Sequence, residues 1–316
     1  MKPALAHVEH GVPDVVTITK AAGDRLRASI LRALAGDSFS VLELGEIFAM
    51  AQPAMSHHLR ILAEAGLVTK RKEGTSIFYQ RFSSNTLTEA IFAALDETEN
   101  DADVAANIAH IYERRADTSA HFFAHNQDAL SQSNDLIAPT AAYSRAILEE
   151  LSSLPTAARR SALEVGPGDG ALLLDLSHQF EQVLGIDTSS ESLQVTAQAV
   201  GENEQIDLKQ KDFLDLPKRP RYDAIVAAMV LHHMPSPARF FEHARSLLKH
   251  QGLLIIAELC THAHDWTRSH CGDLWLGFDA AQLRTWGQRA DLQLTNHQFF
   301  AQRNGFKLQV LSLQAS

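Results

Sequence analysis

The order of apolar and polar residues divides the chain into two differently patterned parts. From Ile18 to Phe82, short runs have apolar residues at helical spacing, as in Asp24 to Leu34, and a strand pattern follows from Leu67. From about residue 155 onward, apolar runs of strand length alternate with helical patterns, which is typical of a parallel sheet. We therefore expect a small helical unit with a hairpin, followed by an α/β domain.

The first part reads as helix, helix, turn, helix and hairpin. Ser40 and Glu43 have the spacing of a capping box, and Pro53 suits the start of a helix after a turn. That helix buries apolar residues at helical spacing and leaves short or cationic side chains on or near the opposite face, free to meet base edges and phosphates: Ser56, His57 and Arg60. The segment from Lys70 to Thr75 is expected to form a basic hairpin tip.

Residues 18 to 82 resemble the ArsR family of bacterial repressors, which are winged helix-turn-helix (α+β) proteins. Met55 to Val68 is similar to that family's recognition helix, and Lys72 to Gly74 followed by Phe78-Tyr79 is similar to its wing. The resemblance implies a homodimer that binds a near-palindromic operator in double-stranded DNA. A winged helix used only for protein contacts is the alternative, but basic residues cluster on the wing of an otherwise acidic chain. The DNA-contacting residues implied are Gln52, Ser56, His57, Arg60, Lys70, Arg71 and Lys72.

Many ArsR proteins sense metals, but the ligand sets common in that family do not match this sequence. The segment Val41 to Gly45 has no thiolate or imidazole where a Cys-x-Cys pair would stand. His110 and Glu113 have a His-x-x-Glu spacing, but their partners would be Glu97 and Glu99, an oxygen-rich set poorly matched to zinc. His262, His264 and Cys271 form an equally weak set. We therefore predict no metal site and expect a different signal.

The most informative stretch runs from Leu163 to Leu172, where an apolar strand is followed by a glycine-rich loop and a helical pattern. Gly166, Gly168 and Gly170 stand at alternate positions, which lets the backbone turn sharply and approach a ligand closely. The Gly-x-Gly-x-x-Gly spacing that cradles a dinucleotide pyrophosphate is absent, so a ligand without phosphates is favoured over the dinucleotide of a dehydrogenase.

Acidic residues follow the next strands in the positions that a nucleoside ligand needs. Asp187 ends the second strand, about 20 residues after the first glycine, where an acid accepts both ribose hydroxyls. Asp212 follows the third strand and can accept from an adenine amino group, while Phe213 beside it can stack on the ring. Leu292 to Leu313, with a tight turn at Asn304-Gly305, reads as a terminal hairpin.

Residues 155 to 316 together resemble the class I S-adenosylmethionine-dependent methyltransferases, which have a Rossmann-like, mostly parallel seven-stranded sheet. The glycine loop, the acid after the second strand, the Asp-Phe pair and the Leu-His-His-Met-Pro loop appear in that family's order. Asp265-Trp266 and Trp275 to Phe278 are similar to methyltransferase domains fused to ArsR-type readers. The resemblance implies these contacts to S-adenosylmethionine or S-adenosylhomocysteine: Glu164 near the amino group, Gly166, Gly168, Gly170, Asp187, Asp212, Phe213 and Val230.

Methyl transfer needs a general base only when the acceptor must lose a proton. Candidate bases are His232 and His233 after the fourth strand and Glu258 at the end of the fifth, with His262, His264 and Asp265 beyond it. Histidines on such loops also commonly serve only as hydrogen-bond partners of the backbone. Whether the chain is an enzyme therefore stays open at this point.

Composition and charge place limits on the surroundings of these two parts. The net charge is −10, only two cysteines occur, and no apolar run approaches the ~20 residues that span a bilayer, so we expect a cytoplasmic protein without disulfides or membrane contact. The expected organisation is a tail (1–15), a winged helix-turn-helix (16–83), a helical joint that contributes dimer contacts and a cofactor lid (84–150), and a methyltransferase domain (151–316). The aromatic residues Phe122, Phe123 and Tyr143 serve such a lid or simple packing.

Two hypotheses of function follow. In the first, the chain is a transcriptional regulator that acts as a repressor, and its methyltransferase-like domain binds S-adenosylmethionine or S-adenosylhomocysteine as a signal. Known fusions that respond to S-adenosylhomocysteine favour this hypothesis by resemblance. In the second, the chain is a working methyltransferase for a small molecule that also regulates its own operon. Both predict cofactor binding, and they differ in whether a methyl group moves.

Overall fold

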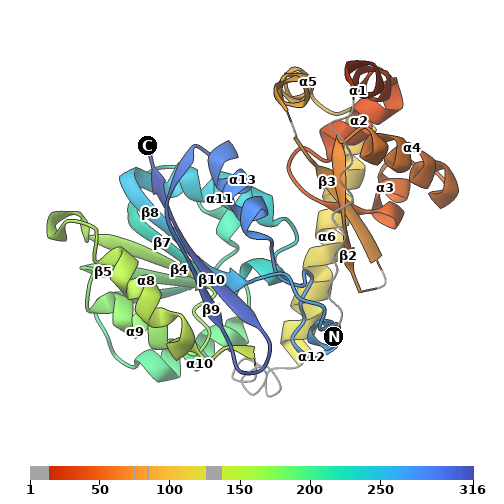
Figure 1. Cartoon of the computed structure of the whole chain (residues 1–316). Coiled ribbons are helices and arrows are strands. Elements are labelled where there is room, and N and C mark those ends of the chain that lie inside the picture. The colour runs from red at the N-terminus through yellow and green to blue at the C-terminus, as the bar shows by residue number, and fades with distance from the viewer. Residues whose placement is uncertain (1–13, 75, 84, 126–136) are drawn as a thin grey trace. The chain divides into compact units, whose positions relative to one another are not determined.

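The computed structural model describes residues 14–74, 76–83, 85–125 and 137–316 and divides into two compact units, Met1–Tyr112 and Glu113–Ser316 (Figure 1). The boundary falls inside helix α6 (Ala102–His125), within the segment 84–150 that is expected to join the domains. None of the helices in the described part of the chain combines the length and the apolar character needed to cross a membrane.

The N-terminal unit is a winged helix-turn-helix, as the sequence predicts. Its three-stranded antiparallel sheet has the order β1-β3-β2. The capping box is confirmed: the Ser40 hydroxyl accepts from the Glu43 amide at 3.2 Å, and the Ser40 amide donates to the Glu43 carboxylate at 2.8 Å. The elements are α1 (Val15–Ala22), α2 (Arg25–Ala33), β1 (Phe39–Ser40), α3 (Val41–Ile47), α4 (Gln52–Glu64), β2 (Val68–Glu73), β3 (Ser76–Arg81), α5 (Thr86–Asp96) and the first part of α6.

This unit has its own apolar core, to which every helix contributes. Met55, Leu59 and Leu62 of α4 are fully buried in it, as their spacing predicts. Val104 and Ile111 from the first half of α6 belong to the same core. The basic residues of the wing differ from the prediction of a hairpin tip: β2 pairs with β3 through Glu73 and Ser76, so Lys70 to Lys72 lie within a strand and the turn begins at Gly74.

The C-terminal unit is built on a seven-stranded sheet with the order β6-β5-β4-β7-β8-β10-β9. β10 runs opposite to the other six strands and pairs antiparallel with both β8 and β9, whereas all other strand pairs are parallel. The predicted mostly parallel sheet and the predicted terminal hairpin are both confirmed. The elements are α8 (Ser144–Leu151), β4 (Ser161–Val165), α9 (Ala171–Ser177), β5 (Gln182–Asp187), α10 (Ser190–Val200), β6 (Ile206–Gln210), β7 (Tyr222–Ala228), α11 (Pro237–Leu247), β8 (Leu248–Leu259), α12 (Trp266–His270), α13 (Ala280–Arg289), β9 (Leu292–Ala301) and β10 (Lys307–Ala315).

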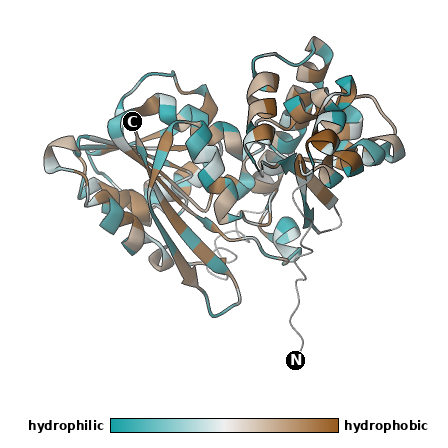
Figure 2. Ribbon diagram, turned by 45° about the horizontal axis from the view of Figure 1, so that its top comes forward, coloured by the Kyte–Doolittle hydropathy of each residue, from teal (hydrophilic) through white to brown (hydrophobic). Residues whose placement is uncertain are grey.

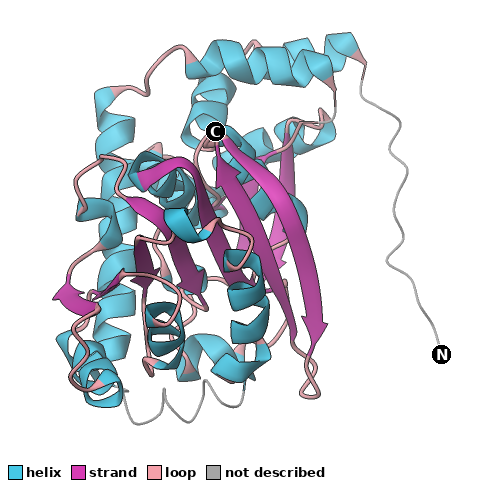
Figure 3. Ribbon diagram, turned by 90° about the vertical axis from the view of Figure 1, so that its left-hand side faces the viewer, coloured by secondary structure: helices cyan, strands magenta, loops and turns pink. Residues whose placement is uncertain are grey.

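Helices cover both faces of this sheet (Figure 3). Every residue of β7 is buried, and hydrophobic residues gather along the central strands (Figure 2). Ala224 and Val226 of β7 share a core with residues of α8 and α9, whereas Ile225 between them points to the other face, because side chains alternate along a strand. A strand buried on both faces has no polar face, which explains its continuous apolar run in the sequence.

The parallel strands β4, β5, β7 and β8 run in one direction, so their carboxyl ends lie along one edge of the sheet. In α/β sheets, ligands bind outside this edge. The loops after these strands carry the glycines, acids and histidines that the sequence singled out.

Candidate functional site

The loop after β4 has an unusual backbone that only glycine adopts readily. Gly166, Gly168 and Gly170 have φ of 67°, 50° and 76°, in the left-handed region. A Cβ on Gly166 would lie 2.8 Å from Cγ2 of Val230, in the loop after β7. The two loops therefore pack against each other, and Gly166 leaves no room for a side chain. This close approach places Val230 beside Gly166.

Glu164 lies in β4, two residues before this loop, with its side chain in the protein interior. The residue is 2% exposed, and its Oε2 has no hydrogen-bond partner among the described residues. Burial raises the pKa of this carboxyl well above its usual value, and the negative charges of Asp169 and Asp175 add to the effect. A buried carboxylate without a partner is costly, so this position favours a cationic ligand group.

Asp187 ends β5, directly beside β4 in the sheet. Its Oδ1 accepts a hydrogen bond from the Ser189 amide at 2.8 Å, and burial raises its pKa. Asp212 follows β6 and is exposed; its Oδ1 accepts from the Leu214 amide at 2.8 Å. Lys211 links the two loops, because its amide donates to the Asp187 carbonyl oxygen at 2.8 Å. The two acids therefore lie at neighbouring strand ends on the glycine-loop edge.

The ring of Phe213 does not lie with these acids. Phe213 is only 3% exposed, and its ring stacks on Phe240 of α11 with a centroid distance of 4.4 Å. Its ring also contacts His243 edge-on. Packing against α11 therefore already covers one face of this ring, and the adenine-stacking role of Phe213 stays a prediction. Tyr143 is likewise a core residue, 7% exposed, so packing describes it better than a lid.

His232 and Glu258, at the ends of β7 and β8, form a buried pair. His232 Nδ1 lies 2.6 Å from Glu258 Oε1, and the His232 amide donates to Glu258 Oε2 at 3.2 Å. The Leu259 amide also donates to Glu258. Burial lowers the pKa of His232, but the charges of Glu258 and Asp273 outweigh it and raise this pKa to about 9. His232 therefore holds a proton at neutral pH and cannot serve as a general base there.

His233 lies against the same group but titrates in the opposite direction. Burial and the positive charge of His232 hold the pKa of His233 well below its usual value. Its Nδ1 lies 3.3 Å from the Gly272 carbonyl oxygen, and its ring meets Phe123 edge-on at 4.9 Å. A neutral imidazole can accept a proton, so of the two histidines only His233 has the charge state of a base.

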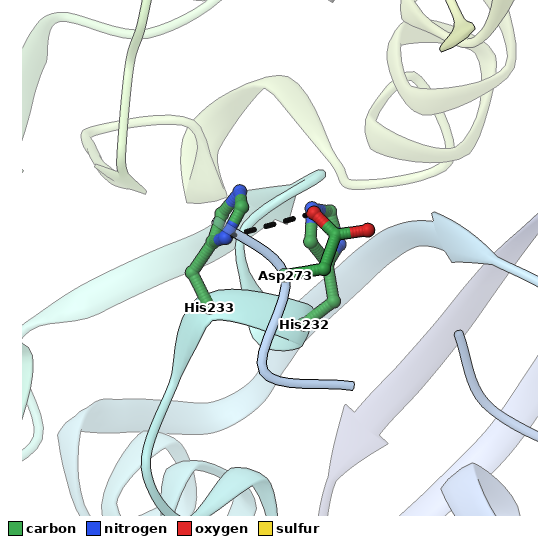
Figure 4. Close-up of side chains that lie close together, drawn as sticks. All are labelled: His232, His233 and Asp273. Carbon is green, nitrogen blue, oxygen red and sulfur yellow. Dashed lines mark ion pairs between the residues drawn. The ribbon is translucent and has the colours of Figure 1, made fainter. Parts of the chain in front are cut away.

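Asp273, on the segment after α12, joins the two histidines (Figure 4). Its Oδ1 lies 3.8 Å from His232 Nε2 and 4.0 Å from His233 Nδ1. The segment is tied to the loop after β7, because the amides of Leu274 and Trp275 both donate to the His232 carbonyl oxygen, at 2.9 and 3.1 Å. The structure therefore places an acid, Asp273, beside the two histidines, and the sequence analysis did not predict it there.

The recognition helix α4 presents its polar residues away from the core. Gln52, His57 and Arg60 are exposed and Ser56 is partly exposed, whereas Met55 and Leu59 are buried. Arg60 is already engaged on the helix surface, with its guanidinium 3.1 Å from Glu64. An exposed pair of this kind is weak and can exchange for a phosphate. All four predicted residues of this helix are thus accessible to DNA within this unit.

The wing separates its basic residues between two faces. Lys70 and Lys72 are exposed, two residues apart on β2, and so share a face. Arg71 points the other way and forms an ion pair with the buried Glu73. The side chain of Arg71 is 18% exposed, so the structure does not place it with the two lysines.

Comparison with protein-family models assigns both units. A methyltransferase domain model matches residues 123–308, more than half of the chain. A helix-turn-helix domain model matches residues 22–71. The chain belongs to the methyltransferase domain family. Its N-terminal unit is an ArsR-type helix-turn-helix domain.

Curated relatives of the helix-turn-helix domain are transcriptional regulators. An uncharacterized HTH-type transcriptional regulator of Methanocaldococcus jannaschii is 48% identical over 63 residues, which is 20% of this chain and 71% of that protein. An arsenical resistance operon repressor of Staphylococcus aureus is 37% identical over 67 residues, 21% of this chain and 64% of that protein. The chain thus spans about two thirds of the length of these regulators.

The methyltransferase domain has solved structures of the same fold. A methyltransferase of Burkholderia thailandensis, crystallised with bound 1,6-didemethyltoxoflavin and S-adenosylhomocysteine, covers 65% of this chain and 90% of its own, with a TM-score of 0.53 and 17% sequence identity. At this identity the likeness concerns the fold alone.

The positions of Asp273 and Arg115 in the methyltransferase domain could not be predicted from the sequence. Asp273 stands far from His232 in the chain, and no local pattern links them. Arg115, in the second half of α6, donates to the Pro235 carbonyl oxygen at 2.9 Å and lies 4.7 Å from the ring centre of Trp275. It thereby braces the loop after β7 and the Asp273 segment. An arginine on a charged helix gives no signal of such a role.

Proposed function

We propose that this protein is a DNA-binding transcriptional repressor whose methyltransferase domain binds S-adenosylmethionine or S-adenosylhomocysteine as its signal. The chain joins an ArsR-type helix-turn-helix domain to a methyltransferase fold, which gives one molecule both a reader and a ligand domain. The observation that carries the proposal is the glycine loop between the buried Glu164 and the partly buried Asp187. Glu164 precedes the glycines and Asp187 ends the adjacent parallel strand.

The residues at this edge fit the parts of the ligand. Glu164, with its unpartnered oxygen, suits the ammonium group of the methionine portion, and the left-handed glycines allow the ligand to approach the backbone. Asp187 suits the ribose hydroxyls and Asp212 the adenine amino group. A ligand without phosphates agrees with the absence of a basic residue from Gly166 to Gly170.

On the DNA side, we propose a homodimer whose two α4 helices enter successive major grooves. Gln52, Ser56, His57 and Arg60 would meet base edges and phosphates, while Lys70 and Lys72 of the wing contact the backbone. Half-sites about 34–36 Å apart would then be required, because one helical turn of DNA separates equivalent grooves.

A direct test measures DNA affinity while each ligand is titrated. Duplex sites selected from random DNA by the full-length protein serve as the probe, followed by fluorescence anisotropy with S-adenosylmethionine or S-adenosylhomocysteine. A coupling of about 5- to 150-fold in DNA affinity is typical of allosteric regulators. Gly166→Ala should abolish the ligand effect, and Gly201→Ala should retain it. If neither ligand changes DNA affinity, the signalling role is rejected.

Catalysis is the second candidate, and the lowered pKa of His233 supports it. This partly buried, neutral imidazole in the loop after β7 can accept a proton from an acceptor molecule. Transfer of a labelled methyl group from S-adenosylmethionine into a metabolite extract, lost in His233→Gln, would establish an enzyme. Absence of any transfer, together with ligand-dependent DNA binding, would leave the sensor alone.

A further inference from the structure

Three side chains with metal-binding atoms meet where the loop after β7 touches the segment after α12. One donor atom from each of His232, His233 and Asp273 lies within 4.8 Å of the others. We propose that these residues bind one divalent transition-metal ion of the Zn²⁺ or Fe²⁺ class. This site differs from the ligand sets of metal-sensing ArsR proteins, which the sequence lacks, and it does not depend on the signalling role proposed above.

The spacing of the donor atoms is close to what such an ion requires. Zinc lies about 2.0–2.2 Å from imidazole nitrogen and carboxylate oxygen, so two donors on one tetrahedral ion are about 3.4 Å apart. Here Asp273 Oδ1 lies 3.8 Å from His232 Nε2 and 4.0 Å from His233 Nδ1. Both distances are too long for hydrogen bonds. Each would have to shorten by only a few tenths of an ångström for the two atoms to bind the same ion. The 3.3 Å contact of His233 Nδ1 with the Gly272 carbonyl oxygen is long, and a bound ion would replace it.

The buried Asp273 carboxylate is a second observation, besides the spacing of the donor atoms, that indicates a bound ion. The residue is 3% exposed, and neither oxygen has a hydrogen-bond partner among the described residues. The neighbouring Thr267 hydroxyl donates instead to the His264 carbonyl oxygen at 3.1 Å. Buried polar groups are almost always satisfied, because an unmade hydrogen bond in the interior is costly. Figure 4 shows this carboxylate facing both imidazole rings, the side from which an ion would satisfy it.

Glu258 occupies the place of an outer carboxylate behind His232. Its Oε1 lies 2.6 Å from His232 Nδ1, so Nδ1 keeps its proton, while Nε2 faces Asp273 and releases its proton when an ion binds. Metal-binding histidines usually donate their second ring N–H to a carboxylate or carbonyl in this way, which fixes the ring orientation. The backbone bonds from Leu274 and Trp275 to the His232 carbonyl oxygen hold the two segments together before any ion binds.

The donor set and its surroundings indicate the class of ion. Two imidazoles and one carboxylate suit zinc or non-haem iron, whereas Mg²⁺ and Ca²⁺ prefer oxygen ligands alone. Asp273 and Gly272 also line a cavity of about 390 Å³, together with Thr118, His121, Phe122, Arg268 and Leu274. Three protein ligands beside a cavity leave a coordination position for water or for a small molecule.

The test uses the full-length protein freed of metal by a chelator and dialysed. Zn²⁺ is titrated with measurement of bound metal by mass spectrometry, and Co²⁺ is titrated as a visible-absorbing substitute. We expect one tight equivalent per chain, with Co²⁺ bands of nitrogen and oxygen ligation. Asp273→Asn and His233→Gln should both lose it, and Glu258→Gln should weaken it by about 10- to 100-fold. His262→Gln, a matched control in the same unit, should bind normally.

Thermal unfolding separates loss of the site from loss of the fold. Zn²⁺ should raise the melting temperature of the parent protein and of His262→Gln but not that of Asp273→Asn, each compared with its own metal-free form. The proposal is overturned if the parent protein binds no stoichiometric metal, or if Asp273→Asn and His233→Gln retain it. It is also overturned if the equivalent is lost in His262→Gln instead. His232 would then be an imidazolium held between Glu258 and Asp273.

Discussion

Replacing Glu164 with glutamine should have opposite effects on the ligand-free protein and on ligand binding. The carboxyl is 2% exposed, its Oε2 lacks a hydrogen-bond partner among the described residues, and burial raises its pKa well above 4.5. A raised pKa means that the folded state binds the proton more tightly than the unfolded state. The contribution of this group to stability is therefore complete below pH 4.5 and is lost as pH rises through the folded pKa.

The size of both effects can be estimated from the same burial. Each pKa unit above the unfolded value contributes about 1.4 kcal/mol to the loss at neutral pH, and Glu164→Gln removes it. A hydrogen bond between the ionised carboxylate and a ligand ammonium group is worth about 1.5–3 kcal/mol. Its loss weakens binding by about 10- to 150-fold, since about 1.4 kcal/mol is a factor of ten. The variant should thus be more stable without ligand and bind more weakly.

Urea unfolding between pH 4 and 8 and calorimetric titration with S-adenosylhomocysteine measure the two effects. Titration in buffers of different ionisation enthalpy should also show proton release on binding to the parent protein and none for Glu164→Gln. Glu149→Gln, an exposed glutamate paired with Arg145, is the matched control and should change neither quantity. A variant that is less stable than the parent at pH 7, or that binds S-adenosylhomocysteine equally well, would refute this reasoning.

Three further predictions concern other parts of the chain. Gly166→Ala should abolish S-adenosylhomocysteine binding in calorimetry. Gly201 is also at positive φ, but nothing lies within 4 Å of a Cβ built on it, so Gly201→Ala should lose only about 1–3 kcal/mol of stability and still bind. Equal binding by both variants would contradict a ligand site at the glycine loop. Lys72→Ala should reduce the slope of log affinity for DNA against log salt by about 0.9, whereas Arg71→Ala should leave the slope unchanged and lower the melting temperature. Burial raises the pKa of Tyr143 from 10.0 to about 12, so the parent protein should lose about 3 kcal/mol relative to Tyr143→Phe as pH rises through that range; parallel alkaline unfolding curves would exclude this.

The fold follows from local signals that agree with one another. Apolar runs such as Tyr222 to Ala228 are long enough to identify buried strands, and the glycines at 166, 168 and 170 permit the left-handed backbone that the loop adopts. Such features depend on neighbouring residues alone. The order of elements then leaves few arrangements for a parallel sheet.

The site was less accessible from sequence, because its chemistry depends on packing between distant segments. The sequence shows that Phe213 follows an acid, Asp212. It does not show that the Phe213 ring stacks on Phe240, because that contact depends on how α11 packs. Arg71 and Lys72 are adjacent cations, and strand pairing decides which of them meets Glu73. Asp273 reaches the histidines through backbone bonds to His232 that no spacing encodes.

Among the described residues, the apolar core of the N-terminal unit and the core on one face of the methyltransferase sheet have no residue in common. One gathers residues from Ile18 to Ile111, and the other gathers residues from Ile137 onward. Protein interiors are packed as tightly as crystals, so a shared core would have forced coordinated substitutions in both halves whenever either changed. Separate cores allow substitutions inside one core without repacking the other. In evolutionary terms, a helix-turn-helix domain with a core of its own can be joined by gene fusion to a domain of another fold.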